Sequence, residues 1–175
     1  GQAEHDNLAQ CILISKDKLI IKKVNEEINK QLKNLPRKAI AKSSLINNGI
    51  LIHMPSDQKI IDTVNKIAPE HLELNIKNYK NMVGKIKNSG SICLGKYAVM
   101  AMTDYGVPGS NHVLPTNTSS RYSSGLSVGE FLKKISYINL SKKGIYSLAP
   151  SVITLANYEG LVGHARSVEK RIRRK

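Results

Sequence analysis

Short apolar runs alternate with segments of helical spacing along the first 95 residues of the chain. The run 11–15 is rich in β-forming residues, and apolar side chains then recur at helical spacing over 18–35 until Pro36. The same alternation continues and predicts a helix over 37–46, a strand over 50–52, a helix from a Ser56 cap to about 67, a strand over 71–74, a helix over 79–87 and a strand over 91–95. This order favours an α/β architecture with a mostly parallel sheet.

The pattern changes after this region. Residues 104–124 are rich in Gly, Pro, Ser and Thr and predict a long irregular loop, which in a compact domain is usually functional. Beyond it we expect a helix over 127–135, an extended segment over 137–140, and a helical stretch over 145–175 with a break at Glu159-Gly160. We therefore divide the chain into an α/β part, residues 1–125, and a helical arm, residues 126–175.

The composition permits one compact domain with a helical appendage, since 41% of the 175 residues are hydrophobic. The formal net charge of +14 raises the prospect of an anionic partner. The Lys and Arg residues are scattered over expected helix surfaces, however, and only the last ten residues form a dense basic run. A nucleic-acid-binding domain is therefore the alternative interpretation, and it lacks aromatic stacking platforms because the chain has one Phe and no Trp.

The cysteine pattern and the apolar runs bear on location. Cys11 and Cys93 each lie in a short apolar run without a Cys-x-x-Cys pair, so we expect two reduced core thiols. No run has the length of a signal segment or a membrane span, so we expect no membrane association and predict a cytoplasmic protein. The chain opens at Gly1 without Met, and we expect it to be a piece of something longer.

Several polar residues have the chemistry of a metal site. Gln2 and His5 are three positions apart, so on a helical turn both side chains leave the same face. Asp104, at the start of the long loop, offers a carboxylate, and His164 on the arm offers a second imidazole. Such a mixed set suits Zn²⁺ or a related divalent ion and leaves coordination positions for a substrate. Taken singly, each histidine would more often have an ordinary surface or core role, and only its neighbours favour the metal site.

A second group of residues suits proton transfer and substrate binding. Glu70 and His71 are adjacent, and they can reach one pocket only at a strand end or turn, where Pro69 helps to place them. Two such groups suit a reaction with two proton transfers, although a solvated Glu beside a half-buried His is an equal alternative. His112, in the loop, is a candidate either to bind a substrate group or to stabilise the loop conformation. Glu159 could offer a carboxylate to a cationic amine.

Six blocks of the sequence resemble the histidinol dehydrogenase family, in the family's order and approximate spacing. The resemblance covers the chain from end to end, and the blocks are Gln2-Ala-Glu-His5, Ala68-Pro-Glu-His-Leu-Glu-Leu74, Gly90-Ser-Ile-Cys-Leu-Gly95, Ser110-Asn-His-Val-Leu-Pro-Thr116, Ser123-Ser-Gly-Leu-Ser-Val128 and Glu159-Gly-Leu-Val-Gly-His-Ala-Arg-Ser-Val168. The resemblance implies a zinc-dependent, two-step, NAD-linked oxidation of L-histidinol through the aldehyde to L-histidine, the last step of histidine biosynthesis.

The resemblance also implies roles for single residues. The zinc ligands fall on Gln2, His5, Asp104 and His164. In such enzymes the residue matching His71 takes the hydroxyl proton, and the residue matching Glu70 activates the attacking water. The substrate contacts fall on these six residues together with His112 and Glu159.

The family further implies a homodimer with shared active sites, in which the arm reaches the partner's site. The expected fold is then half of an incomplete Rossmann-like α/β domain followed by a dimerisation arm. We find no Gly-x-Gly-x-x-Gly after a strand, so NAD is expected to bind mainly outside this chain. The sequence does not identify the cofactor-binding residues, and it permits an inactive remnant as a further alternative.

Overall fold

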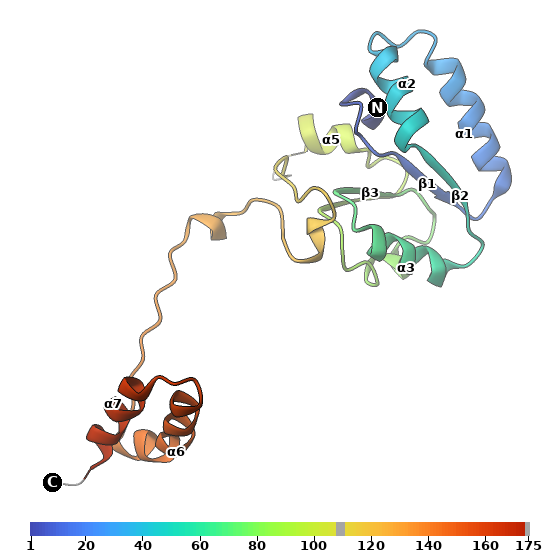
Figure 1. Cartoon of the computed structure of the whole chain (residues 1–175). Coiled ribbons are helices and arrows are strands. Elements are labelled where there is room, and N and C mark those ends of the chain that lie inside the picture. The colour runs from blue at the N-terminus through green and yellow to red at the C-terminus, as the bar shows by residue number, and fades with distance from the viewer. Residues whose placement is uncertain (108–110, 174–175) are drawn as a thin grey trace. The chain divides into compact units, whose positions relative to one another are not determined.

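The chain forms two compact units in a computed structural model that describes residues 1–107 and 111–173. The first unit spans Gly1–Glu130 and the second spans Phe131–Lys175 (Figure 1). The division predicted from the sequence lies between residues 125 and 126. Within the predicted 104–124 loop, residues 108–110 lie outside the described residues. The last two residues of the predicted terminal helix and of the basic run also lie outside them.

The first half of the first unit is a strand, two helices and a second strand. Its elements are the 3-10 turn η1 (Gln2–Glu4), β1 (Ile12–Ser15), α1 (Lys18–Gln31), α2 (Lys38–Asn48) and β2 (Ile50–His53). β1 and β2 pair in parallel, with Ile12 opposite Ile50, and α1 contacts both strands. Asp17 caps α1 by accepting a 2.7 Å hydrogen bond from the backbone N–H of Leu19. The predicted continuation of this helix to residue 35 is wrong, because the chain turns before Pro36, which disfavours helix in the preceding residue.

The second half of this unit repeats the alternation with shorter helices. Its elements are α3 (Asp57–Ile67), β3 (His71–Leu74), α4 (Lys80–Val83), β4 (Ser91–Leu94) and α5 (Met100–Tyr105). β3 and β4 pair in parallel, with Glu73 opposite Cys93. The predicted helix over 79–87 is shortened to α4, because the side chain of Asn65 binds the backbone of the loop at Lys85, Lys87 and Asn88.

The described strands confirm the α/β class and the parallel pairing. They form two separate two-stranded sheets, β1–β2 and β3–β4, where the sequence predicted one mostly parallel sheet. The buried apolar residues come from the helices as well as from these strands, and they include Ala41, Ile61, Val64, Leu74 and Cys93. In the β1–β2 sheet, Ile50 and Leu51 remain 43% and 38% exposed, so this sheet is not covered on both faces in the described chain.

The second unit is a helical hairpin of α6 (Lys142–Tyr158) and α7 (Val162–Ile172). Ser141 caps α6, and the hydroxyl of Tyr146 donates a 2.8 Å hydrogen bond to the carbonyl of Ile172. The predicted break is confirmed, since α6 ends at Tyr158 and Gly160 has a φ of +76°, a conformation that favours glycine. The predicted helix over 127–135 is wrong: only the short 3-10 turn η3 (Val128–Phe131) forms there.

Within residues 1–107 and 111–173, every helix is too short or too polar to cross a bilayer.

Candidate functional site

Glu70 and His71 lie side by side where α3 gives way to β3. Ala68 ends α3 in the left-handed conformation, with φ of 51°, and the chain then turns so that His71 is the first residue of β3. Oε1 of Glu70 lies 3.5 Å from Nε2 of His71, and the two side chains are 34% and 19% exposed. Within the described residues, Nδ1 of His71 is buried and has no hydrogen-bond partner. The arrangement leaves Nε2, beside a carboxylate, as the atom that can exchange protons.

Two segments hold the backbone of this turn. The backbone N–H of Gly90 donates to the carbonyl of Pro69 at 3.0 Å, and that of Ser91 donates to the carbonyl of Glu70 at 2.8 Å. From the long loop, the buried hydroxyl of Ser120 donates to the carbonyl of Ala68 at 2.9 Å. The position of Glu70 and His71, the acid–imidazole pair, therefore depends on contacts to its backbone. The sequence did not predict this role for the residues that make these contacts.

Asp104 lies on α5, a helix that the sequence did not predict. Its carboxylate is only 14% exposed, and Oδ1 lies 3.1 Å from Nδ1 of His112, whose side chain is 72% exposed. The structure thus joins a predicted metal ligand to a predicted substrate-binding residue. Imidazoles and carboxylates near a metal are commonly hydrogen-bonded to each other in this way, which fixes the ligand's orientation.

The buried Cys93 thiol lies close to two carboxylates. Burial raises the pKa of Cys93 most strongly, and the negative charges of Glu73 and Asp104 raise it further. Burial also raises the pKa of the half-buried Cys11. Both cysteines are free, as predicted, and both thiols are held in the protonated form that makes them poor nucleophiles.

Gln2 and His5 lie on and directly after the 3-10 turn η1. The backbone N–H of His5 donates to the carbonyl of Gln2 at 3.2 Å, and residues three apart on such a turn present their side chains on the same face. Ala3 is buried, and the guanidinium of Arg37 donates a 3.3 Å hydrogen bond to the carbonyl of His5. The turn is therefore anchored against the start of α2.

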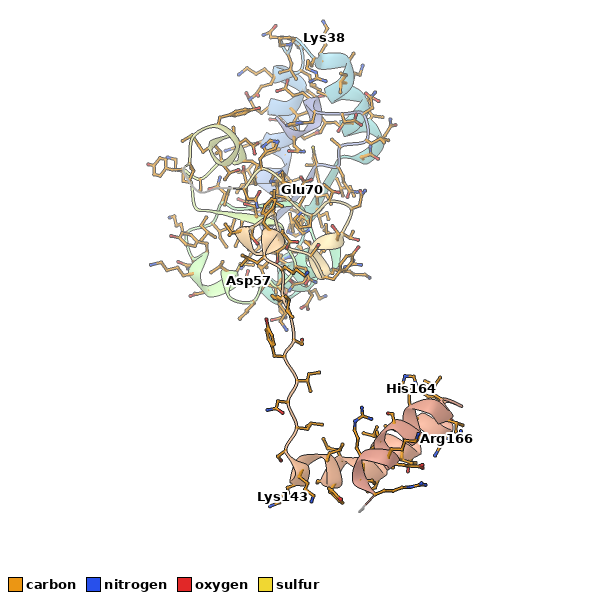
Figure 2. All side chains as sticks on the ribbon, turned by 90° about the vertical axis from the view of Figure 1, so that its left-hand side faces the viewer. Lys38, Asp57, Glu70, Lys143, His164 and Arg166 are labelled. Carbon is orange, nitrogen blue, oxygen red and sulfur yellow. The ribbon has the colours of Figure 1, made fainter. Side chains whose placement is uncertain are left out.

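Glu159 and His164 belong to the second unit. Glu159 directly follows α6, and His164 lies in the first turn of α7, where its N–H donates to the carbonyl of Leu161 at 2.9 Å. Figure 2 labels Glu70 on the first unit and His164 on the second. Six of the eight predicted site residues thus come from one unit and two from the other.

No complete metal cluster forms within the part of the chain that the structure describes. There, no group of three or more His, Cys, Asp or Glu residues could hold a metal ion. The predicted ligand set contributes only His5 and Asp104 of these residue types to the first unit, because Gln2 is an amide and His164 lies in the second unit.

Comparisons with known proteins give one consistent result. Residues 1–172 match the family described as histidinol dehydrogenase. The chain is 84% identical over all 175 residues to a histidinol dehydrogenase of Pelagibacter ubique, of whose length it covers 41%. It is 44% identical over 171 residues to a histidinol dehydrogenase of Listeria monocytogenes, of whose length it covers 40%.

A solved structure agrees with these sequence matches. The crystal structure of histidinol dehydrogenase from Elizabethkingia anophelis superposes with a TM-score of 0.79 at 38% identity. The match covers 97% of this chain and 39% of that chain. The chain therefore spans about two-fifths of the length of the relatives that it matches.

Proposed function

Because the chain belongs to the histidinol dehydrogenase family, we propose that it acts as the C-terminal part of a zinc- and NAD-dependent enzyme that oxidises L-histidinol to L-histidine. The reaction is the last step of histidine biosynthesis and passes through histidinaldehyde. The observation that carries the proposal is the 84% identity, without a gap in coverage, over all 175 residues.

The acid–imidazole pair supplies the proton transfers. In the first oxidation, Nε2 of His71 accepts the proton of the substrate's hydroxyl group while a hydride leaves the carbon that bears this group, which gives the aldehyde. Glu70 then accepts a proton from water as that water attacks the aldehyde carbon. His71 releases its first proton to solvent and, in the second oxidation, takes a proton from the resulting hydrate as the second hydride leaves, which gives the carboxylic acid. The 3.5 Å separation between Oε1 of Glu70 and Nε2 of His71 supports this division of work, because two proton acceptors side by side can serve the same substrate carbon.

NAD, when bound, supplies the hydride acceptor, and the two oxidations would use two NAD molecules in turn because each accepts one hydride. We propose that it binds mainly through the part of the enzyme that lies outside these 175 residues, since the chain has no Gly-x-Gly-x-x-Gly after a strand.

A zinc ion fits the donor chemistry of the proposed ligands. Gln2 offers an amide oxygen, His5 and His164 offer imidazoles, and Asp104 offers a largely buried carboxylate that His112 orients. Zinc, when bound, would orient the substrate and exclude water, with polarisation of its oxygen as a lesser effect. His112 and Glu159 would contact the substrate, together with the zinc ligands and the acid–imidazole pair.

We propose that the enzyme is a two-fold homodimer with shared sites. Leu148, Val152 and Leu155 follow one face of α6 and are 50%, 43% and 62% exposed, although apolar faces of this kind are normally buried. A second copy that covers this face would receive Glu159 and His164 into its own site. Each site would then draw its remaining residues from the other chain.

We also propose a cytoplasmic location, which the free thiols of Cys11 and Cys93 support. No feature of residues 1–107 and 111–173 favours the nucleic-acid alternative. Within the basic terminal run, the Arg171 guanidinium donates a 2.6 Å hydrogen bond to the carbonyl of Ser167. The +14 charge has no functional explanation in this structure.

Zinc content tests the proposal directly. The test protein is the Pelagibacter ubique enzyme with this chain in place of its matching region, which we call the chimeric enzyme. His5→Ala is expected to remove most of its zinc, because a site that loses one imidazole ligand binds zinc more weakly. Elemental analysis measures the effect, and His53→Ala, at a histidine outside the ligand set, is the matched control. Unchanged zinc in His5→Ala would show that the ligand assignment is wrong.

Gly90→Ala tests how the acid–imidazole pair is held. A Cβ at Gly90 would lie 2.6 Å from the carbonyl oxygen of Glu70 and 3.1 Å from the ring of Pro115, so the turn must shift. We expect a loss of about 1–3 kcal/mol in the free energy of unfolding, measured by chemical denaturation of the chimeric enzyme.

Gly84→Ala is the control for this glycine substitution, because a Cβ there meets nothing within 4 Å and the backbone is right-handed helical. It is expected to leave stability unchanged or to raise it slightly. Equal destabilisation by both substitutions would argue against a specific steric role of Gly90.

A further inference from the structure

A carboxylate from β3 binds the first backbone N–H of α5, the helix that carries Asp104. Oε1 of Glu73 accepts a 2.9 Å hydrogen bond from the backbone N–H of Met100, the first residue of α5. The residue at the N-cap position is Val99, whose side chain cannot accept a hydrogen bond. Glu73, 27 positions earlier in the chain, therefore provides a side-chain cap that the local sequence lacks.

This contact matters because α5 is short. The helix has six residues, too few to be stable without tertiary support, and its N-terminal N–H groups need partners. Asp104 lies four positions after Met100, at the other end of the same helix. A shift at the start of α5 would therefore move the Asp104 carboxylate.

Glu73 also belongs to the strand that begins with His71 of the acid–imidazole pair. His71 and Glu73 are two residues apart on β3, so their side chains leave the same face of the strand. We propose that Glu73 is a positioning residue, which fixes the distance between the acid–imidazole pair at the start of β3 and Asp104, the proposed metal ligand on α5. The inference rests on the function proposed above for Asp104.

The surroundings of Cys93 support the same arrangement. Cys93 pairs with Glu73 across the β3–β4 ladder, and it is only 4% exposed. The charges of both Glu73 and Asp104 act on its thiol. Glu73, Cys93 and Asp104 are therefore neighbours, although they come from β3, β4 and α5.

The affinity for zinc in the chimeric enzyme tests the role of Glu73. Glu73→Ala removes the acceptor and is expected to weaken zinc binding by about tenfold, the lower end of the usual effect of losing a group that orients a ligand. Glu73→Gln keeps an acceptor oxygen at the same place and is expected to retain most of the affinity. The dissociation constant is measured by competition with a chromogenic chelator.

A second variant removes the donor of the same hydrogen bond. Met100→Pro lacks the N–H, yet proline is tolerated at the first helical position, and Val99 already has the extended backbone that precedes proline. It is expected to weaken zinc binding as Glu73→Ala does, and the double variant should be no weaker than either single variant. Met100→Ala, which keeps the N–H, controls for the loss of the side chain.

Asp17→Ala is the matched control for a general loss of stability. It removes a carboxylate cap from α1 in the same unit and should leave zinc affinity unchanged. The inference is overturned if Glu73→Ala binds zinc like the parent, or if Asp17→Ala weakens zinc binding equally. If zinc fails to bind the parent enzyme, both the proposed function and this inference fail. If only His5→Ala lowers the affinity, the proposed function stands and the role of Glu73 is wrong.

Discussion

Glu70→Gln in the chimeric enzyme is expected to slow the oxidation of the aldehyde by about 10²–10⁴-fold, the usual contribution of a positioned general base. The amide cannot accept a proton from the attacking water. The oxidation of the alcohol needs no water, so that step is expected to slow much less. The effect on the alcohol step is limited to the lost charge beside His71, whose Nε2 lies 3.5 Å from Oε1 of Glu70.

Single-turnover formation of NADH separates the two steps, with histidinol as the substrate for the first oxidation and histidinaldehyde for the second. Glu26→Gln, at an exposed carboxylate on α1 whose salt-bridge partner is Lys22, is the control and should change neither rate. Equal slowing of both oxidations by Glu70→Gln would contradict the division of work between Glu70 and His71.

The helices and strands of the first unit were largely predictable because their signals are local. Asp17 and Ser56 each accept a hydrogen bond from a backbone N–H two or three residues later, at the starts of α1 and α3. The buried positions Ile61 and Val64 of α3 follow helical spacing. Local spacing does not identify which strands are neighbours, and for this reason the sequence predicted one sheet where the described strands form two pairs.

The helix α5 was missed because the group that caps it is distant in sequence. Glu73 is 27 positions from Met100, and nothing around Val99 indicates a helix start. The predicted helix over 127–135 was wrong for a different reason: the local pattern is helical, but tertiary support is small. Its apolar residues fit helical spacing, yet Phe131 and Leu132 are 78% and 64% exposed, so little burial is available to stabilise a helix there.

The candidate site was predictable to the same limited extent. The closeness of Glu70 and His71 follows from their adjacency at a strand start, which Pro69 helps to place. The contact between Asp104 and His112, which are eight residues apart, is not specified by residue spacing. The remaining question, which chain supplies His164, depends on assembly.

A mixture of two inactive variants is expected to regain about a quarter of the parent activity if the sites are shared between chains. His5→Ala and His164→Ala each remove an imidazole from the proposed zinc site, and each is expected to be inactive alone. Random exchange makes half of the dimers hybrids. In a hybrid, one site combines both damaged contributions, and the other combines the intact His5 of one chain with the intact His164 of its partner.

The control for this experiment pairs His5→Ala with Asp104→Ala. Both residues belong to the first unit, so both are supplied to a site by the same chain and no hybrid site is intact; this mixture should stay inactive. Native mass spectrometry measures subunit exchange in both mixtures. If the His5→Ala and His164→Ala mixture exchanges subunits and stays inactive, His164 serves its own chain. The exposed apolar face of α6 would then cover a different surface from the one proposed here.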